Sequence, residues 1–430
     1  MKNNKTIILI VVVALIAVVT ISIVFIANGN SKEKLQNEVM NNIAQENKNS
    51  ETQNTSIGEE GHTEEENNVI EKLPDITVKG KIAAEKSKYT DSNGNIAVIP
   101  SGFGVVTNSP NSNDGLVISD VENDDLENSK KGNQFVWIPV PDPVIDVSRA
   151  NDDSQINEVI SKSIDDGKYP MAIKLESGDY KSILYEFKSK NLGSAIDVSF
   201  VRYQTGSNGL CEPENLRSGD NKDNITDWTD SLYQEEYNEM IKAVKESKGF
   251  WVARFETSVS SEGIAQSKKD ERIFSGESWY TCYNVQKTLN VETTKSHMIW
   301  GTQWDQIMIW LKNVINNDGV ANKFYILDST NMGNYLETQV SNKEENIIIK
   351  DKGVATKCKS GEIEISKVKN IYDLAGNVFE WTMEANYQSV RIVRGGYCTY
   401  GATTYPASSR YYTASPDYIN TAFGSRMVLY

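Results

Sequence analysis

The side chains best suited to hold a metal ion or to act as nucleophiles are few in this chain of 430 residues, which has two histidines and four cysteines. His62 and His297 cannot form a three-histidine iron or zinc site within one chain. A Ser-His-Asp triad would have to use His297, because His62 lies in a segment whose composition is typical of disorder. The cysteines show no C-x-x-C spacing, which argues against a zinc knuckle and leaves one or two disulfides open in an exported domain. These cysteines are Cys211, Cys282, Cys358 and Cys398.

Tyrosines gather near the C-terminus, where they alternate with Thr, Ser, Ala and Asn. A tyrosine offers a large rigid ring with a polar tip, and small polar neighbours adapt around it, as in antibody loops. This pattern predicts a ligand-binding face for a protein or a glycan. Its residues are Tyr397, Tyr400, Tyr405, Arg410, Tyr411, Tyr412 and Tyr418. The alternative is that these tyrosines fill a core that is rich in loops.

The net charge of −15 restricts the partners. A surface that follows nucleic-acid phosphates needs clustered Lys and Arg, and the sequence has no such stripe. We therefore expect no nucleic-acid partner.

The element that would position these residues in the cell is an apolar segment at 7–27, which has no charged residue. A helix of this length spans the hydrocarbon layer of a bilayer, about 30 Å thick. Lys2 and Lys5 precede it, so the positive-inside rule places the N-terminus in the cytoplasm and the rest of the chain outside. The segment thus predicts a single-pass membrane protein, with a cleaved signal peptide or an inverted topology as alternatives.

The rest of the chain divides by composition. Residues 28–75 are rich in Asn, Glu, Gln, Ser and Lys, which predicts a disordered stalk. The pattern at residues 76–130 predicts a small β-rich region. This region is either a separate subdomain or a set of extra strands of the main domain. Residues 131–430 make up the remainder of the chain and hold the motifs described below.

Local patterns place several elements in these regions. Short apolar runs predict strands at 96–100, 115–118, 135–140 and 250–256. A helix is expected after Asp152 and another at 231–247. In the second helix, apolar residues recur at helical spacing and are interpreted as core. They are Tyr233, Tyr237, Met240, Ile241 and Val244.

Four blocks resemble the formylglycine-generating-enzyme (sulfatase-modifying-factor) family, which has a C-type-lectin-like fold. The first two are 250–257 (FWVARFET) and 297–305 (HMIWGTQWD), followed by a short helix with Ile307, Met308 and Leu311 inward. The third, 373–382 (DLAGNVFEWT), is similar to D-x-x-G-N-V-W-E-W-T, and R-G-G follows at 394–396. The last consists of Ser409-Arg410 and Gly424-Ser425-Arg426. The resemblance implies an α+β fold, a loop-rich C-type-lectin-like domain behind the transmembrane helix and the disordered stalk. This main domain would cover residues 131–430, with a helical insertion at about 143–248.

The resemblance also implies a calcium site in the third block. The matching ligands are the carboxylates of Asp373 and Glu380 and the carbonyl groups of Gly376 and Val378. Hard oxygen ligands of this kind suit Ca²⁺. The alternative is a capped turn in which Glu380 binds backbone N–H groups.

The catalytic residues of both activities known for the family are absent from this sequence. One branch holds copper with a cysteine pair after R-G-G, and counting from Gly396 puts those positions on Tyr400 and Tyr405. The other branch uses three histidines. We therefore expect no redox metal and a membrane-anchored extracytoplasmic binding module rather than an enzyme. A divergent metal oxidase using Cys398 and a structural envelope protein are the alternatives.

Overall fold

The computed structural model describes residues 69–127, 132–150, 152–189, 196–202, 210–212, 230–314, 325–342, 347–386 and 390–430. Within these ranges the chain is mixed α+β, as predicted, with many short strands. The predicted cytoplasmic tip and transmembrane helix at 1–27, and the predicted stalk up to residue 68, lie outside them. None of the helices in the described ranges is long and apolar enough to cross a bilayer.

The largest sheet in the described part of the chain has the strand order β15-β16-β23-β12-β5-β4-β3. The bounds are β3 Gly104–Val105, β4 Val117–Ser119, β5 Gln134–Pro139, β12 Gly249–Ala253, β15 Asn290–Val291, β16 Thr294–Met298 and β23 Met427–Leu429. Two strands expected from their apolar runs, β5 and β12, pair antiparallel. Trp137 lies opposite Trp251, with ring centroids 5.0 Å apart. The last strand, β23, pairs with both β12 and β16, so the C-terminal residues are part of this sheet.

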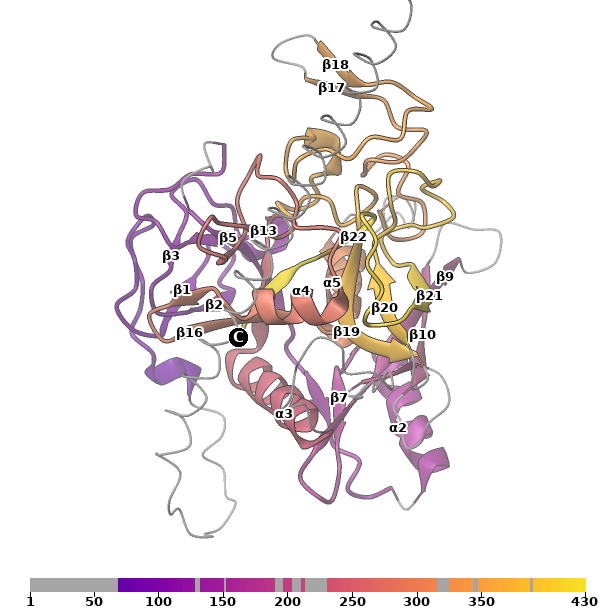
Figure 1. Cartoon of the computed structure of the whole chain (residues 1–430). Coiled ribbons are helices and arrows are strands. Elements are labelled where there is room, and N and C mark those ends of the chain that lie inside the picture. The colour runs from indigo at the N-terminus through magenta and orange to yellow at the C-terminus, as the bar shows by residue number, and fades with distance from the viewer. Residues whose placement is uncertain are drawn as a thin grey trace, which may run out of the picture. The chain divides into compact units, whose positions relative to one another are not determined.

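A second sheet carries the third and fourth sequence blocks. Its order is β11-β19-β20-β21, and β22 runs parallel to β19. The bounds are β11 Leu210–Cys211, β19 Phe379–Asn386, β20 Val390–Arg394, β21 Arg410–Ala414 and β22 Phe423–Ser425. Strand β19 is buried from Phe379 to Ala385 and contacts helix α5 (Gly301–Val314), which lies beside it in Figure 1.

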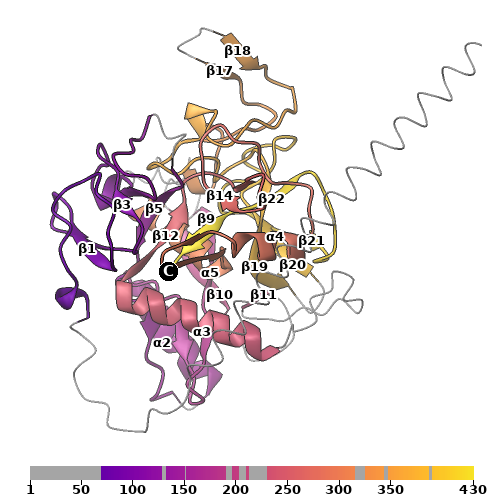
Figure 2. The same cartoon turned by 60° about the vertical axis from the view of Figure 1, so that its left-hand side comes forward.

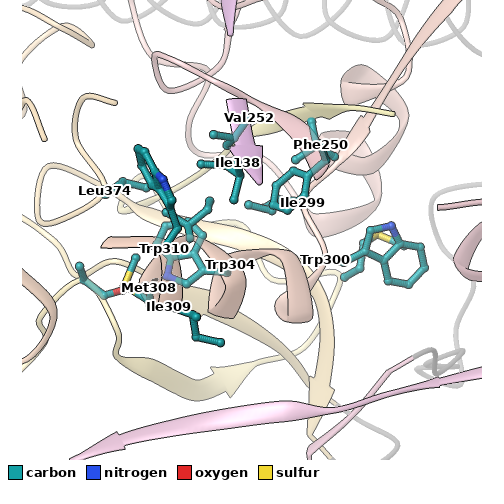
Figure 3. Close-up of a cluster of buried hydrophobic side chains, with 14 of the residues drawn as sticks. Ile138, Phe250, Val252, Ile299, Trp300, Trp304, Met308, Ile309, Trp310 and Leu374 are labelled. Carbon is teal, nitrogen blue, oxygen red and sulfur yellow. Dashed lines mark hydrogen bonds between the residues drawn. The ribbon is translucent and has the colours of Figure 1, made fainter. Parts of the chain in front are cut away.

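Helix α5 supplies the centre of the core. All residues from Gly301 to Leu311 are buried, which is typical of a helix enclosed on every side. Ile307, Met308 and Leu311 are inward, as predicted. Figure 3 shows Met308 and its neighbours in this cluster, together with Leu374 from the third sequence block. Helix α4 (Trp279–Gln286) begins after Ser278, whose hydroxyl accepts a hydrogen bond from the Thr281 N–H.

Residues 76–130 are extra strands of the main domain rather than a separate subdomain, since β3 and β4 continue the largest sheet. A hairpin of β1 (Ser87–Thr90) and β2 (Ile96–Ile99) precedes them, and a short 3₁₀ helix, η3 (Ser112–Asp114), lies between β3 and β4. Ile70, in the 3₁₀ helix η2 (Ile70–Lys72), and Leu73, which follows it, pack against a second buried cluster, to which β3, β4 and β5 contribute side chains. The folded part therefore begins before residue 76, and the predicted stalk boundary is too late.

The insertion at 143–248 is mixed, not simply helical as predicted. It contains α2 (Asp153–Asp165) and α3 (Asp230–Ser247), but also strands. These are β6 Val144–Ile145, β7 Ala172–Lys174, β8 Tyr180–Ser182, β9 Leu184–Ser189 and β10 Ile196–Arg202, besides β11. Helix α3, which is labelled in Figure 2, contacts β8 and β12. Its predicted apolar face is confirmed as core, because the five side chains at 233, 237, 240, 241 and 244 are all buried.

The remaining elements are short. They are the hairpin strands β13 Ser258–Val259 and β14 Ala265–Gln266, the hairpin strands β17 Val340–Asn342 and β18 Ile347–Lys350, and the 3₁₀ helix η4 Glu364–Ser366.

Candidate functional site

A tight turn after β20 starts the tyrosine-rich loop. Gly395 and Gly396 both have φ +86°, a conformation that favours glycine. A Cβ on Gly396 would lie 2.4 Å from the carbonyl oxygen of Tyr405, so no larger residue fits there. The Tyr335 hydroxyl contacts the carbonyl oxygens of Gly395 (3.0 Å) and Tyr405 (2.6 Å), and thus ties the two ends of the loop together.

The loop and strand β22 enclose a cavity of about 440 Å³, which we call the aromatic cup. Its lining consists of Phe379, Tyr397, Tyr400, Tyr411, Tyr418, Asn420, Ala422 and Phe423. Four of the predicted ligand-binding tyrosines thereby lie around one cavity. No residue in this lining carries a charged side chain. The cup is therefore suited to a neutral ligand or ligand segment that can lie against aromatic rings.

Phe379 forms the base of the cup and is 1% exposed. Its ring stacks on that of Tyr411, with centroids 5.2 Å apart and an interplanar angle of 8°. The Phe423 ring meets it edge-on at 6.0 Å, because parallel pairing places residues 379 and 423 side by side. The rings of Tyr397 and Tyr400 also contact Phe379, as does that of Tyr405 at 5.6 Å.

The rim of the cup is accessible. Tyr400 is 38% exposed and Tyr418 is 48% exposed. Burial is the main cause that raises the pKa of Tyr397 and of Tyr400, so both phenols stay protonated near neutral pH. A protonated phenol can donate or accept a hydrogen bond. The Asn420 side-chain amide donates to the Tyr418 hydroxyl at 3.2 Å, which adds a second polar position on the rim.

The other predicted ligand-binding residues do not line the cup. Tyr405 packs behind it, against Tyr400 (4.8 Å) and Tyr411 (5.4 Å). The backbone of Tyr412 belongs to β21, and its side chain lies outside the described part of the structure.

Arg410 belongs to the scaffold rather than to the binding surface, which corrects the prediction. Its side chain is 6% exposed and forms ion pairs with Glu384 (2.8 Å) and Asp305. Arg394 pairs with the same two carboxylates, at 3.2 and 2.9 Å. Two arginines and two acids thus neutralise one another in a buried cluster that joins α5 to β19, β20 and β21. Arg394 also donates to the carbonyl oxygens of residues 408 and 409, as expected for an arginine that braces loops.

The base of the cup was not among the predicted ligand-binding residues. Phe379 stands in the third sequence block, and Phe423 precedes the glycine of the last block. Their position depends on the parallel pairing of β19 with β22. A local pattern contains no signal for that pairing.

The predicted calcium ligands lie in a loop that is bonded to the rest of the protein. Asp373 Oδ2 accepts from the Gly361 N–H (2.8 Å) and the Ser360 hydroxyl (3.2 Å), whereas its Oδ1 is buried without a hydrogen-bond partner. The Arg426 guanidinium binds both oxygens of Glu380, with distances from 2.5 to 3.1 Å. Asp373 Oδ1 therefore fits a cation, but Glu380 is already paired with a cation from this chain.

Gly376 has φ +73°, and a Cβ there would lie 2.5 Å from the carbonyl oxygen of Asn334. It therefore permits the turn that carries its own carbonyl group and that of Val378. Among the described residues, no group of three or more His, Cys, Asp or Glu side chains is placed to hold a metal ion.

Cys398 is buried and has no disulfide partner in the structure. Burial raises the pKa of its thiol, which disfavours the reactive thiolate. His297 is also buried, with its ring stacked on Trp300 (5.5 Å) and Nε2 3.3 Å from Glu236. Neither residue lines the aromatic cup.

Comparisons with known proteins are sparse. No protein-family model matches the chain, and no curated protein matches it. Among solved structures, one match is Treponema denticola variable protein 1, at 15% sequence identity, covering 58% of this chain and 95% of that chain, with a TM-score of 0.19. A likeness of this size carries no argument, so the family resemblance remains a prediction from the sequence blocks.

Proposed function

We propose that this protein is a membrane-anchored extracytoplasmic binding module that presents the aromatic cup to a protein or glycan ligand. The observation that supports it most strongly is the group of Tyr397, Tyr400, Tyr411 and Tyr418 around one uncharged cavity. Rings with exposed faces and protonated tips can bind a ligand through contact area and hydrogen bonds together. The anchor is residues 7–27, which would hold the N-terminus in the cytoplasm and the cup on the outside.

The test is a binding screen of the purified full chain against a glycan array and a displayed peptide library. We expect saturable binding to at least one class of probe, reduced at least tenfold in the double variant Tyr400→Ala/Tyr418→Ala. Ile419→Ala is the matched control, because Ile419 is 65% exposed beside the cup but does not line it. Equal binding by the double variant and the wild type would remove the cup from the proposal.

Calcium binding by the third sequence block is the second part of the proposal. The unpartnered Asp373 Oδ1 is the position that could accept a cation, and full ligation by Glu380 requires that Arg426 release it. We expect calcium to raise the melting temperature of the full chain relative to an EDTA-treated sample, and Asp373→Asn to abolish the increase. An unchanged melting temperature in calcium would favour the alternative, in which the loop is held by its protein contacts alone.

A further inference from the structure

Two buried cysteines from distant parts of the sequence meet at one asparagine. The Cys358 N–H donates to the Asn377 side-chain oxygen (2.9 Å), and the Asn377 amide nitrogen donates back to the Cys358 carbonyl oxygen (3.2 Å). On the other side, the Cys398 N–H donates to the Asn377 main-chain oxygen (3.3 Å). Asn377 is fully buried, so it holds both cysteine backbones inside the protein.

The electrostatics agree with this proximity. Burial is the main cause that raises the pKa of Cys358 to about 12, and the neighbouring Cys398 raises it further. Lys350 lies close enough to both sulfur atoms to favour their thiolate forms. Both side chains are nearly inaccessible, with 6% of Cys358 and 1% of Cys398 exposed.

Each of these two cysteines also lies next to a segment that lines or adjoins the aromatic cup. Cys398 follows Tyr397, which lines the cup. Next to Cys358, the Lys357 ammonium group donates to the carbonyl oxygen of Thr421 (2.7 Å), one residue before Ala422 of the lining. A covalent link between the cysteines would fix the loop after Gly396 relative to the segment around residue 358.

We propose that Cys358 and Cys398 form a disulfide when the domain is exposed to an oxidised dithiol carrier or to oxidised glutathione. The thiolate of one cysteine attacks the disulfide of the oxidant, which gives a mixed disulfide and releases one thiol. The thiolate of the other cysteine then displaces the second thiol and completes the bond. Two electrons pass from the cysteine pair to the oxidant, and each cysteine loses one proton.

The raised pKa values and the burial predict that this exchange is slow in the folded protein. It should be faster during folding, before the two thiols are buried. The inference does not depend on the proposed ligand, because it concerns a bond within the chain.

The test uses the full chain, unfolded in reducing denaturant and refolded with a mixture of oxidised and reduced glutathione. Alkylation under denaturing conditions should modify two cysteines, compared with four after reduction. Mass spectrometry of the unreduced digest should find a fragment that joins Cys358 to Cys398. Four free thiols, or a bond that involves Cys211 or Cys282, would overturn the proposal.

Cys282 provides the matched control, since it is equally buried but lies in helix α4. Cys282→Ser should retain the linked fragment, whereas Cys358→Ser and Cys398→Ser should each lose it. If either of these two variants fails to fold, the wild type still decides the question: its oxidised form should melt several degrees above its reduced form. The same melting temperature for both forms, with no linked fragment, would contradict the bond.

Discussion

Two groups of aromatic rings in this chain have opposite relations to solvent. The first, which we call the closed cluster, consists of Tyr233, Trp279, Tyr283, His297 and Trp300, all buried. Here the Tyr283 hydroxyl donates to Glu236 (2.5 Å), and the Trp279 indole N–H donates to the Thr382 carbonyl oxygen (2.8 Å). In the aromatic cup, by contrast, the rings pack on Phe379 but Tyr400 and Tyr418 stay exposed.

The difference shows what distinguishes an aromatic group that stabilises the fold from one that can bind. In the closed cluster, the rings are packed on all sides, and the polar groups of Tyr283 and Trp279 have partners within the chain, so no ring face is left for a ligand. In the cup, Phe379 at the base packs against Phe423, whereas the tyrosines of the rim keep rings and hydroxyl groups accessible. Composition alone does not separate the two groups, because both are rich in tyrosine.

Trp279→Ala should give the largest effect on stability. Trp279 is fully buried, stacks on Tyr283 at 5.2 Å, and lies 4.1 Å from the Arg391 guanidinium. Truncation leaves a cavity and removes one of the two aromatic rings that the Arg391 guanidinium contacts, which should cost about 3–5 kcal/mol of the free energy of unfolding. Chemical denaturation of the full chain measures it. A loss below about 1 kcal/mol would show that the closed cluster is not a stabilising core.

Glu236→Gln should give the second largest loss of stability, and the size of this loss should depend on pH. Burial alone would raise the pKa of Glu236, but Lys287 and His297 outweigh it and lower the value to about 2. The carboxylate therefore stabilises the folded state above pH 4.5, and this contribution, about 3 kcal/mol, is lost as the pH falls toward 2. The variant should be less stable than the wild type at pH 7, and the difference should shrink in acid. A difference that stays constant between pH 7 and pH 3 would contradict this assignment.

The sequence predicted local features better than the site. Helix α3 and strands β5 and β12 follow from spacing within a few residues, as does the inward face of α5 at Ile307 and Met308. The tyrosines of the cup could be predicted by type because they are concentrated in one segment.

Arg410 shows why the rest could not be predicted. Whether it points to a ligand or to Asp305 depends on how β21 packs on α5, far away in the sequence. The meeting of Cys358 with Cys398 depends in the same way on the turn around Asn377. Contacts of this kind are set by tertiary packing, which leaves no local pattern.

Phe379→Leu would sharpen the comparison, because Phe379 is buried like the closed cluster but supports the cup. Leucine keeps the apolar contact, so we expect a loss of about 1 kcal/mol of the free energy of unfolding. The substitution removes the aromatic ring on which Tyr411 stacks, so the affinity for the probe found in the screen should fall at least tenfold. Isothermal titration calorimetry measures the affinity. Phe135→Leu is the control, because Phe135 is a buried phenylalanine in strand β5 of the other sheet. Equal affinities for Phe379→Leu and Phe135→Leu would show that the base does not shape the cup.

Tyr418→Ala should have the smallest effect on stability and is the clearest test of the difference between the two groups. The Tyr418 side chain is 48% exposed, and its contacts are the Phe423 ring at 5.9 Å and the Asn420 amide. Substitution of so exposed a residue should change the free energy of unfolding by less than about 0.5 kcal/mol. Affinity for the probe should nevertheless fall severalfold, because the ring forms part of the rim. Parallel denaturation and titration experiments measure both quantities. If stability fell by several kcal/mol while affinity stayed the same, the rim would belong with the closed cluster, and the cup would be a covered part of the core.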